Sequence, residues 1–178
     1  MYINSIKKIT ISAMFLVIGV VLPFLTGQIK EIGDTLLPMH LPVMLCGLIC
    51  SFKYGLAVGL ILPFIRAVTV GMPPIYPNAI WMSLELATYG FVVGFLYFTF
   101  NKKQMWWLYC CLLTAMISGR IVWGISKTIL LGISGKEFTI QAFIAGGIVD
   151  SLPGIVLQLV LIPAIIKLKD VLLERLDK

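Results

Sequence analysis

Long apolar stretches separated by short polar breaks run along the chain. These stretches are residues 6–25, 37–51, 54–70, 78–100, 105–132 and 139–167. The longer ones match the ~20 apolar residues with which an α-helix spans the hydrocarbon core of a bilayer. Glycines recur inside them, which favours helices over a β-barrel. The pattern predicts an all-α membrane protein, a six-transmembrane-helix bundle.

Composition agrees with a membrane protein of one domain. Hydrophobic residues make up 60% of the chain and charged residues 12%, with a mean hydropathy of +1.02. Soluble domains carry about 25% charged residues. We therefore expect a single transmembrane domain over residues 1–178. The second and third stretches, joined by "SFKY", are short, so one of them is expected to be tilted or broken.

Basic residues predict the orientation. Six spans would place both termini on one side, together with nine of the 14 lysines and arginines. These nine are Lys7, Lys8, Lys53, Lys102, Lys103, Lys167, Lys169, Arg175 and Lys178. Cytoplasmic loops carry the excess of positive charge, so both termini are expected to be cytoplasmic. Topology then explains the net charge of +6 better than binding to nucleic acid does.

Five ionisable side chains lie inside the predicted spans: Arg66, Glu85, Arg120, Lys127 and Asp150. Because a charge at a helix centre costs at least ~2.5–3.5 kcal/mol on insertion, a functional role is the default expectation. Counted from the outer ends of the spans at ~1.5 Å per residue, all five could line one cavity that opens outward. The same count gives Arg120 and Asp150 equal depth. An ion pair that joins two helices and contact with a ligand are both compatible with that depth.

Aromatic residues share helix faces with these charges. Trp81, Glu85 and Tyr89 follow one another at i, i+4 and i+8, one stripe of the fourth span. A second stripe, on the fifth span, consists of Arg120, Trp123 and Lys127. The two stripes and the embedded charges give the candidate substrate-binding residues, which are Glu85, Trp81, Tyr89, Arg120, Trp123, Lys127, Asp150 and Arg66.

Structural roles compete with binding at several of these positions. Arg66 and Lys127 are long enough to reach the outer headgroups, and Trp81 and Trp123 could belong to an interfacial aromatic belt. Glu85 is too short to reach the headgroups from its depth, so a functional role is favoured there.

Enzyme, metal and cofactor signatures are absent from the sequence. It contains no HExxH, phosphate-binding loop or nucleophile elbow, so neither catalytic residues, a metal site nor a cofactor are expected. The single histidine, His40, is expected to be a polar residue at a helix start, with a ligand or gating role as the alternative. The four cysteines are expected to be small packing residues. Glycines at positions 47, 55, 59, 90 and 94 predict close helix–helix contact.

The segment "MHLPVMLCGLICSFKYGLAVGLILPFIRAVTVGMPPIYPNAIWMSLELATYGFVVGFLY" and the later "SGRIVWG" and "GIVDSLPGIVLQLVLIPAII" resemble the substrate-binding S components of energy-coupling factor (ECF) transporters. The resemblance implies a vitamin-binding six-helix protein of the bacterial cell membrane. It further implies docking on a membrane coupling subunit that is driven by two cytoplasmic ATPases. The Ala-x-x-x-Ala docking pattern of the family's first helix is not kept, because Val17 follows four residues after Ala13. A small-residue face remains only in Ser12, Ala13 and Gly19.

Three functions are compatible with these features. The first is a high-affinity binding subunit for uptake of a small vitamin or vitamin-like precursor. The second is a self-sufficient proton-coupled secondary transporter with Glu85 or Asp150 as a proton relay, and the third is a membrane scaffold. The substrate stays open among pantothenate, pyridoxine, a thiamine pyrimidine precursor and a queuosine precursor.

Overall fold

A computed structural model describes residues 4–26, 35–100, 104–135 and 137–176, and every regular element in these ranges is helical. The α-helices are α1 (Ser5–Val21), α3 (His40–Cys50), α4 (Phe52–Val70), α5 (Ile80–Phe100), α6 (Met105–Ile133), α7 (Ile140–Ile144) and α8 (Leu152–Leu176). A 3-10 turn, η1 (Leu22–Thr26), and two π turns, η2 (Ile75–Ala79) and η3 (Ala145–Val149), extend or join them.

Among the described residues, five helical segments are long and apolar enough to cross a membrane. They begin or end close to the predicted spans, except that the second predicted span is only the 11-residue helix α3. At ~1.5 Å per residue such a helix covers about 17 Å, roughly half of the ~30 Å hydrocarbon core. The chain is therefore a multi-pass membrane protein with one short helix in the bundle.

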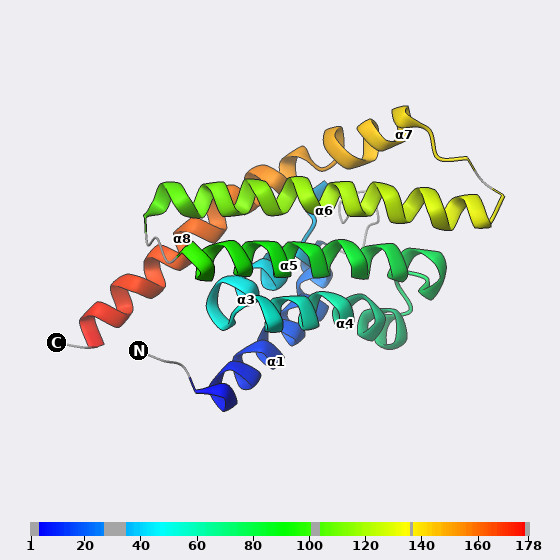
Figure 1. Cartoon of the computed structure of the whole chain (residues 1–178). Helices are drawn as coiled ribbons and strands as arrows, with labels where there is room; N and C mark the ends of the chain where they lie inside the picture. Colours follow the sequence, from blue (N-terminus) through cyan, green and yellow to red (C-terminus); the bar gives the residue numbers. More distant parts are fainter. Residues whose placement is uncertain (1–3, 27–34, 101–103, 136, 177–178) are drawn as a thin grey trace.

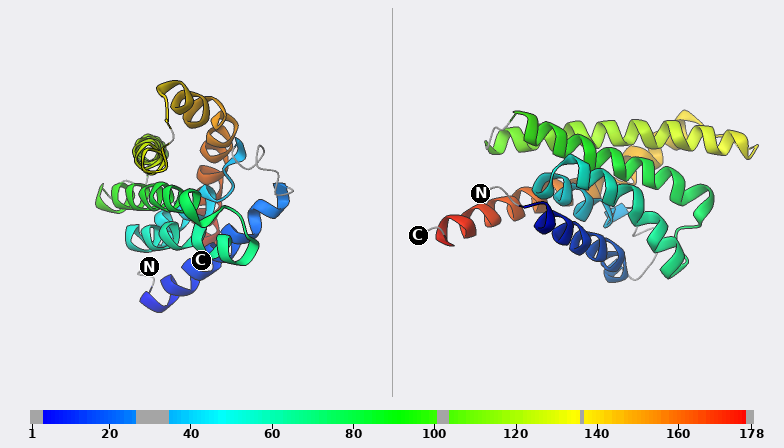
Figure 2. Two further views of the ribbon diagram at one scale, coloured as in Figure 1. Left: turned by 90° about the vertical axis from the view of Figure 1, so that its right-hand side faces the viewer. Right: turned by 60° about the horizontal axis from the view of Figure 1, so that its bottom comes forward.

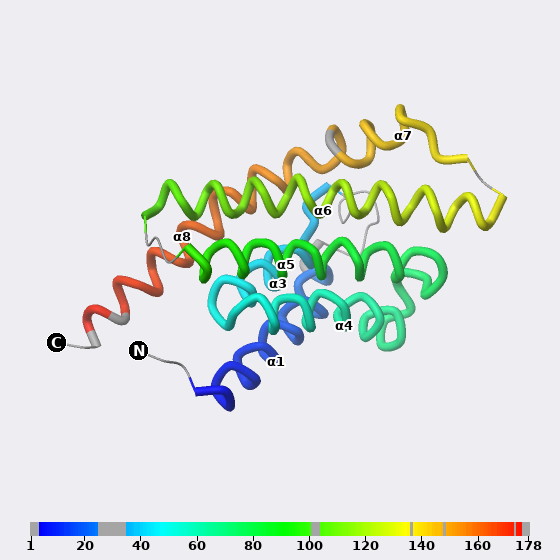
Figure 3. Tube along the Cα trace, in the orientation of Figure 1, coloured from blue at the N-terminus to red at the C-terminus, as the bar shows by residue number. Residues whose placement is uncertain are grey.

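Helix α5 lies at the centre of the arrangement, between α6 and the pair α3 and α4 (Figure 1). Helix α1 packs on the outer side of α3 and α4, and α8 contacts α6 and α3. In Figure 3 the beginning of α1 and the end of α8 lie at the same end of the bundle. The turns that follow α4 and α6 lie at the opposite end.

Glycines bring the backbones of α3, α4 and α5 into direct contact. A Cβ added at Gly55 would lie 2.6 Å from the carbonyl oxygen of Gly90, and one at Gly94 would lie 2.7 Å from that of Gly47. Real Cβ atoms do not approach other atoms so closely, so only glycine fits at these positions. The predicted close-packing role of these glycines is confirmed.

Three sequence-based boundaries are wrong. Helix α4 begins at Phe52, directly after Ser51 with its φ of 111°, so "SFKY" mostly starts a helix rather than forming a loop. The last predicted span is broken into α7, η3 and α8. The last predicted span also ends too early, at residue 167, because α8 continues without interruption to Leu176.

The predicted small-residue face of the first helix is also wrong. Ser12 and Gly19 point into the bundle, against Cys46 and Leu62 respectively, whereas Ala13 is exposed. Residues spaced by seven lie on one face of a helix, and Ala13 lies about 100° away from that face. All four cysteines are free thiols, and three of them are buried, in agreement with packing roles.

Candidate functional site

A buried ion pair joins α5 to α6. Glu85 is only 2% exposed, and its Oε1 accepts a hydrogen bond of 3.0 Å from Nη1 of Arg120. Nε2 of His40, the first residue of α3, lies 3.4 Å from the same oxygen. Helices α5 and α6 run antiparallel. Glu85, near the start of α5, therefore lies level with Arg120, near the middle of α6. A carboxylate buried this deeply requires such partners.

The ion pair of Arg120 with Asp150, one of the two alternatives that the sequence left open, is not formed. Arg120 contacts Glu85 instead, while the side chain of Asp150 is exposed and takes part in no ion pair within the described ranges. The depth count failed because it assumed an unbroken last span, whereas the π turn η3 ends at Val149, directly before Asp150. Helix α6 has 29 residues, about 43 Å at ~1.5 Å per residue, and its C-terminal end extends past the start of α5 (Figure 1).

Tyr89 packs beside the ion pair, one turn further along α5. Its ring centre lies 4.9 Å from that of His40 in an edge-on arrangement, and the side chain is 2% exposed. Gly119 on α6 makes room for this ring, since a Cβ there would lie 2.7 Å from it. The aromatic residue therefore fixes the distance between α5 and α6 next to the charges.

Aromatic rings surround the ammonium group of Lys127. Its Nζ lies 4.4 Å from the ring centre of Trp123, 4.9 Å from that of Phe138 and 5.5 Å from that of Trp81. Such cation–π contacts stabilise a cation out of water. Trp81 and Trp123 are 9% and 7% exposed, so these indoles face the protein interior and are not residues of a lipid-facing belt.

Arg66 lies apart from this group. Its Nη1 contacts Sδ of Met39 at 3.4 Å, and it forms no ion pair with Glu85. Because Arg66 lies apart and Asp150 is exposed, the five embedded charges do not line one cavity. Glu85 and Arg120 are in contact, and Lys127 is linked to them through Trp123, whose ring centre lies 5.7 Å from Cζ of Arg120. We use the name "charged cluster" for Glu85, Arg120, Lys127 and His40.

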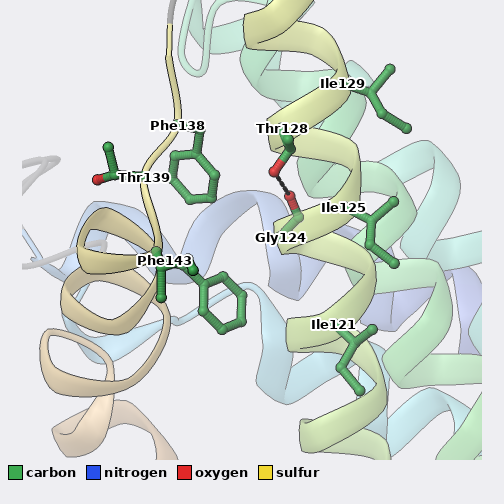
Figure 4. A pocket seen from close by; sticks show the side chains of 9 residues that line it. Ile121, Gly124, Ile125, Thr128, Ile129, Phe138, Thr139 and Phe143 are labelled. Carbon is green, nitrogen blue, oxygen red and sulfur yellow. Dashed lines mark hydrogen bonds between the residues drawn. The ribbon is translucent and has the colours of Figure 1, made fainter.

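An apolar groove of about 400 Å³ runs along the other side of α6. Ile121, Gly124 and Ile125 form one wall, and Phe138 and Phe143 form the other (Figure 4). The ring of Phe143 packs directly on Gly124, so a Cβ at this position would require the ring to move. None of the charged residues lines this groove.

Two polar side chains near the bundle interior were not among the predicted binding residues. His40 contacts Glu85, and the only sequence signal was its place as a lone histidine at the start of an apolar helix. Gln158 on α8 is 1% exposed, and its Nε2 has no hydrogen-bond partner in the described part of the chain. A glutamine inside an apolar stretch was a signal that could have been used.

No group of three or more His, Cys, Asp or Glu side chains is placed to hold a metal ion among the residues that the structure describes. The charged cluster is suited to binding rather than to metal chemistry: it offers a buried carboxylate, two cations and aromatic faces. Such a combination can orient a small polar ligand through hydrogen bonds and stacking.

Comparison with protein-family models matches residues 7–166 to the ECF transporter, substrate-specific component. Comparisons with curated proteins and with solved structures find no match. The matched family consists of transport subunits that bind substrate in the membrane for uptake, and it is not a family of enzymes. Because the match extends over nearly the whole chain, this protein belongs to the substrate-specific component family of ECF transporters.

Proposed function

We propose that the protein captures a small vitamin or vitamin-like precursor with high affinity outside the bacterial cell membrane and delivers it to an ATP-driven coupling module. The observation that carries this proposal is the buried contact of Glu85 with Arg120 between α5 and α6, inside a member of this family. Buried charges are costly in a membrane protein, and those that persist there mark substrate pathways.

In this proposal, the charged and the aromatic residues of the site have different roles. Glu85 and Arg120 supply a hydrogen-bond acceptor and donors for polar groups of the ligand. Trp81, Tyr89 and Trp123 supply ring faces on which a planar ligand can stack. Arg66 and Asp150 are left out of the core of the site, because their side chains lie apart from the charged cluster.

We further propose that both termini are cytoplasmic and that a membrane coupling subunit, driven by two cytoplasmic ATPases, docks on the bundle. The outward face of α1 supports docking there: Ile9, Ala13 and Val17 are exposed at i, i+4 and i+8, with Ile9 at 59% and Val17 at 58%. This face is apolar, and no described helix covers it, so another helix could pack against it.

Reconstitution tests the proposed function. Proteoliposomes that contain this chain alone should bind the substrate without accumulating it, because capture and energy supply reside in different subunits. Accumulation should begin when a coupling module and internal ATP are added. Accumulation by the chain alone would contradict the proposal.

A proton-coupled secondary transporter is the second candidate, and the contact of His40 with Glu85 favours it, since this pair could exchange a proton. It predicts uptake by the chain alone that is abolished by an uncoupler and unaffected by ATP. The same proteoliposomes therefore separate the two functions.

A further inference from the structure

Arg120 uses only part of its guanidinium group to bind Glu85. Nη1 makes that contact, whereas Nε and Nη2 are buried and have no hydrogen-bond partner in the described residues. These two nitrogens form one edge of the planar group and point their hydrogens in the same direction. Buried donors normally have partners, so an edge of this kind calls for an explanation.

The chemistry of that edge selects its partner. Two parallel N–H groups match the two oxygens of a carboxylate and bind them in bidentate fashion. The sign of the charge agrees, because this edge belongs to a cation and therefore attracts an anionic ligand and repels a cationic one.

The aromatic ring beside Arg120 also favours a ligand group that is planar, as a carboxylate is. The ring of Trp123 lies 5.7 Å from Cζ of Arg120, so the guanidinium group already has an aromatic face beside it. On α6 the neighbours Gly119, Trp123 and Gly124 carry no charge, and the charged side chain in contact with Arg120 is Glu85. A phosphate, with three oxygens and up to two charges, calls for more donors than the two on this edge of Arg120.

The part of the chain that separates the groove from Arg120 is the α7 segment, by which we mean residues 137–144. Helix α6 is seen end-on in the left view of Figure 2, with α5 and α7 on different sides of it. The α7 segment reaches α6 through side chains: Phe143 packs on Gly124, one turn from Arg120, and Phe138 and Phe143 lie 5.7 and 5.9 Å from the ring centre of Trp123. Rotation of Phe143 would extend the groove of Figure 4 toward Arg120.

We propose that the ligand of this protein is a small organic acid whose carboxylate binds the Nε–Nη2 edge of Arg120. This inference rests on the proposed function and adds the chemical class of the substrate to it. The carboxylate would be held side-on by Arg120 while Glu85 keeps Nη1 in place, so Glu85 also acts as a positioning residue for the guanidinium group.

The first experiment leaves the protein unchanged and varies the ligand. Small molecules released from the purified, denatured full-length chain are identified by mass spectrometry. In parallel, thermal unfolding of the chain in lipid nanodiscs is measured with acid and amide pairs: pantothenate, nicotinate, biotin and 4-pyridoxate, each against its carboxamide. We expect a released or stabilising compound that carries a carboxylate, and we expect its amide to bind at least 10-fold more weakly.

The second experiment changes the protein and uses the compound found in the first. Arg120→Lys keeps a positive charge opposite Glu85 but cannot present two coplanar donors. We expect affinity to fall about 10–150-fold, the range for a lost hydrogen bond to a charged group. Arg175→Lys, at the exposed end of α8, is the matched control and should bind as the unaltered chain does. Affinity is measured per folded molecule by calorimetric titration.

The outcomes separate this inference from the function on which it rests. A bound compound without a carboxylate, an amide that binds as well as its acid, or unchanged affinity in Arg120→Lys would overturn the carboxylate inference alone. A chain that releases no small molecule and is stabilised by no compound would overturn the proposed capture function, and the inference with it.

Discussion

The bundle is held together in two different ways. Helices α3, α4 and α5 touch through their backbones at glycines, as at Gly55 and Gly90. The α7 segment instead reaches α6 through the rings of Phe138 and Phe143, beside an open groove. Backbone contacts allow no rearrangement without clashes, whereas side chains can rotate. The comparison indicates a rigid half and a half that can open, with the charged cluster between them.

The largest expected effect concerns the ion pair at the boundary of the two halves. Arg120→Gln would leave the buried carboxylate of Glu85 without its cation and should lower the free energy of unfolding by ~3–5 kcal/mol. Removing both charges, with Glu85→Gln added, should cost clearly less than the sum of the two single changes. Thermal unfolding in detergent measures all three variants. Strictly additive losses would contradict the pair.

The next effect tests the rigid half. Gly90→Ala places a methyl group against the backbone of Gly55 and should destabilise the protein by ~1–3 kcal/mol or more through overpacking. Gly132→Ala in α6 is the matched control, since its Cβ would meet no atom within 4 Å. That variant should be neutral or gain up to ~1 kcal/mol from lower chain entropy in the unfolded state. Equal effects of the two changes would remove the distinction between the halves.

A smaller effect is expected in the half that can open. Phe143 is partly buried, so Phe143→Ala should lower stability by less than the ~3–5 kcal/mol typical of a fully buried phenylalanine. It should also speed ligand association, because the ring no longer covers Gly124. Stopped-flow binding with the identified ligand checks this. Slower or unchanged association would show that the ring does not lie on the access route.

The smallest effect is expected at Asp150. Its side chain is exposed and forms no ion pair with any described residue, so Asp150→Asn should change the free energy of unfolding by no more than ~0.5 kcal/mol. The same assay used for Arg120→Gln gives the comparison directly. A loss as large as that of Arg120→Gln would restore the pair of Arg120 with Asp150 that the sequence suggested.

Much of the fold could be predicted because it depends on local pattern. The length of the apolar stretches predicted the membrane helices, and the glycines predicted close helix packing but not which helices meet. The break between α7 and α8 was missed, since the apolar pattern continues through it. Helix α3 was expected to be short, but its predicted start at residue 37 lies three residues before the observed start at His40, although Pro38 lies between the two positions.

The candidate site shows where the sequence stops being sufficient. By itself the sequence determined which side chains are unusual in a membrane, and it grouped Trp81, Glu85 and Tyr89 on one helix face. Only the tertiary structure decided the partner of Glu85. Helical periodicity fixes the direction of a side chain on its own helix, but the contact of Glu85 with Arg120 depends on how far α6 slides along α5. That offset is set by side-chain packing, such as the ring of Tyr89 on Gly119, between residues distant in the sequence.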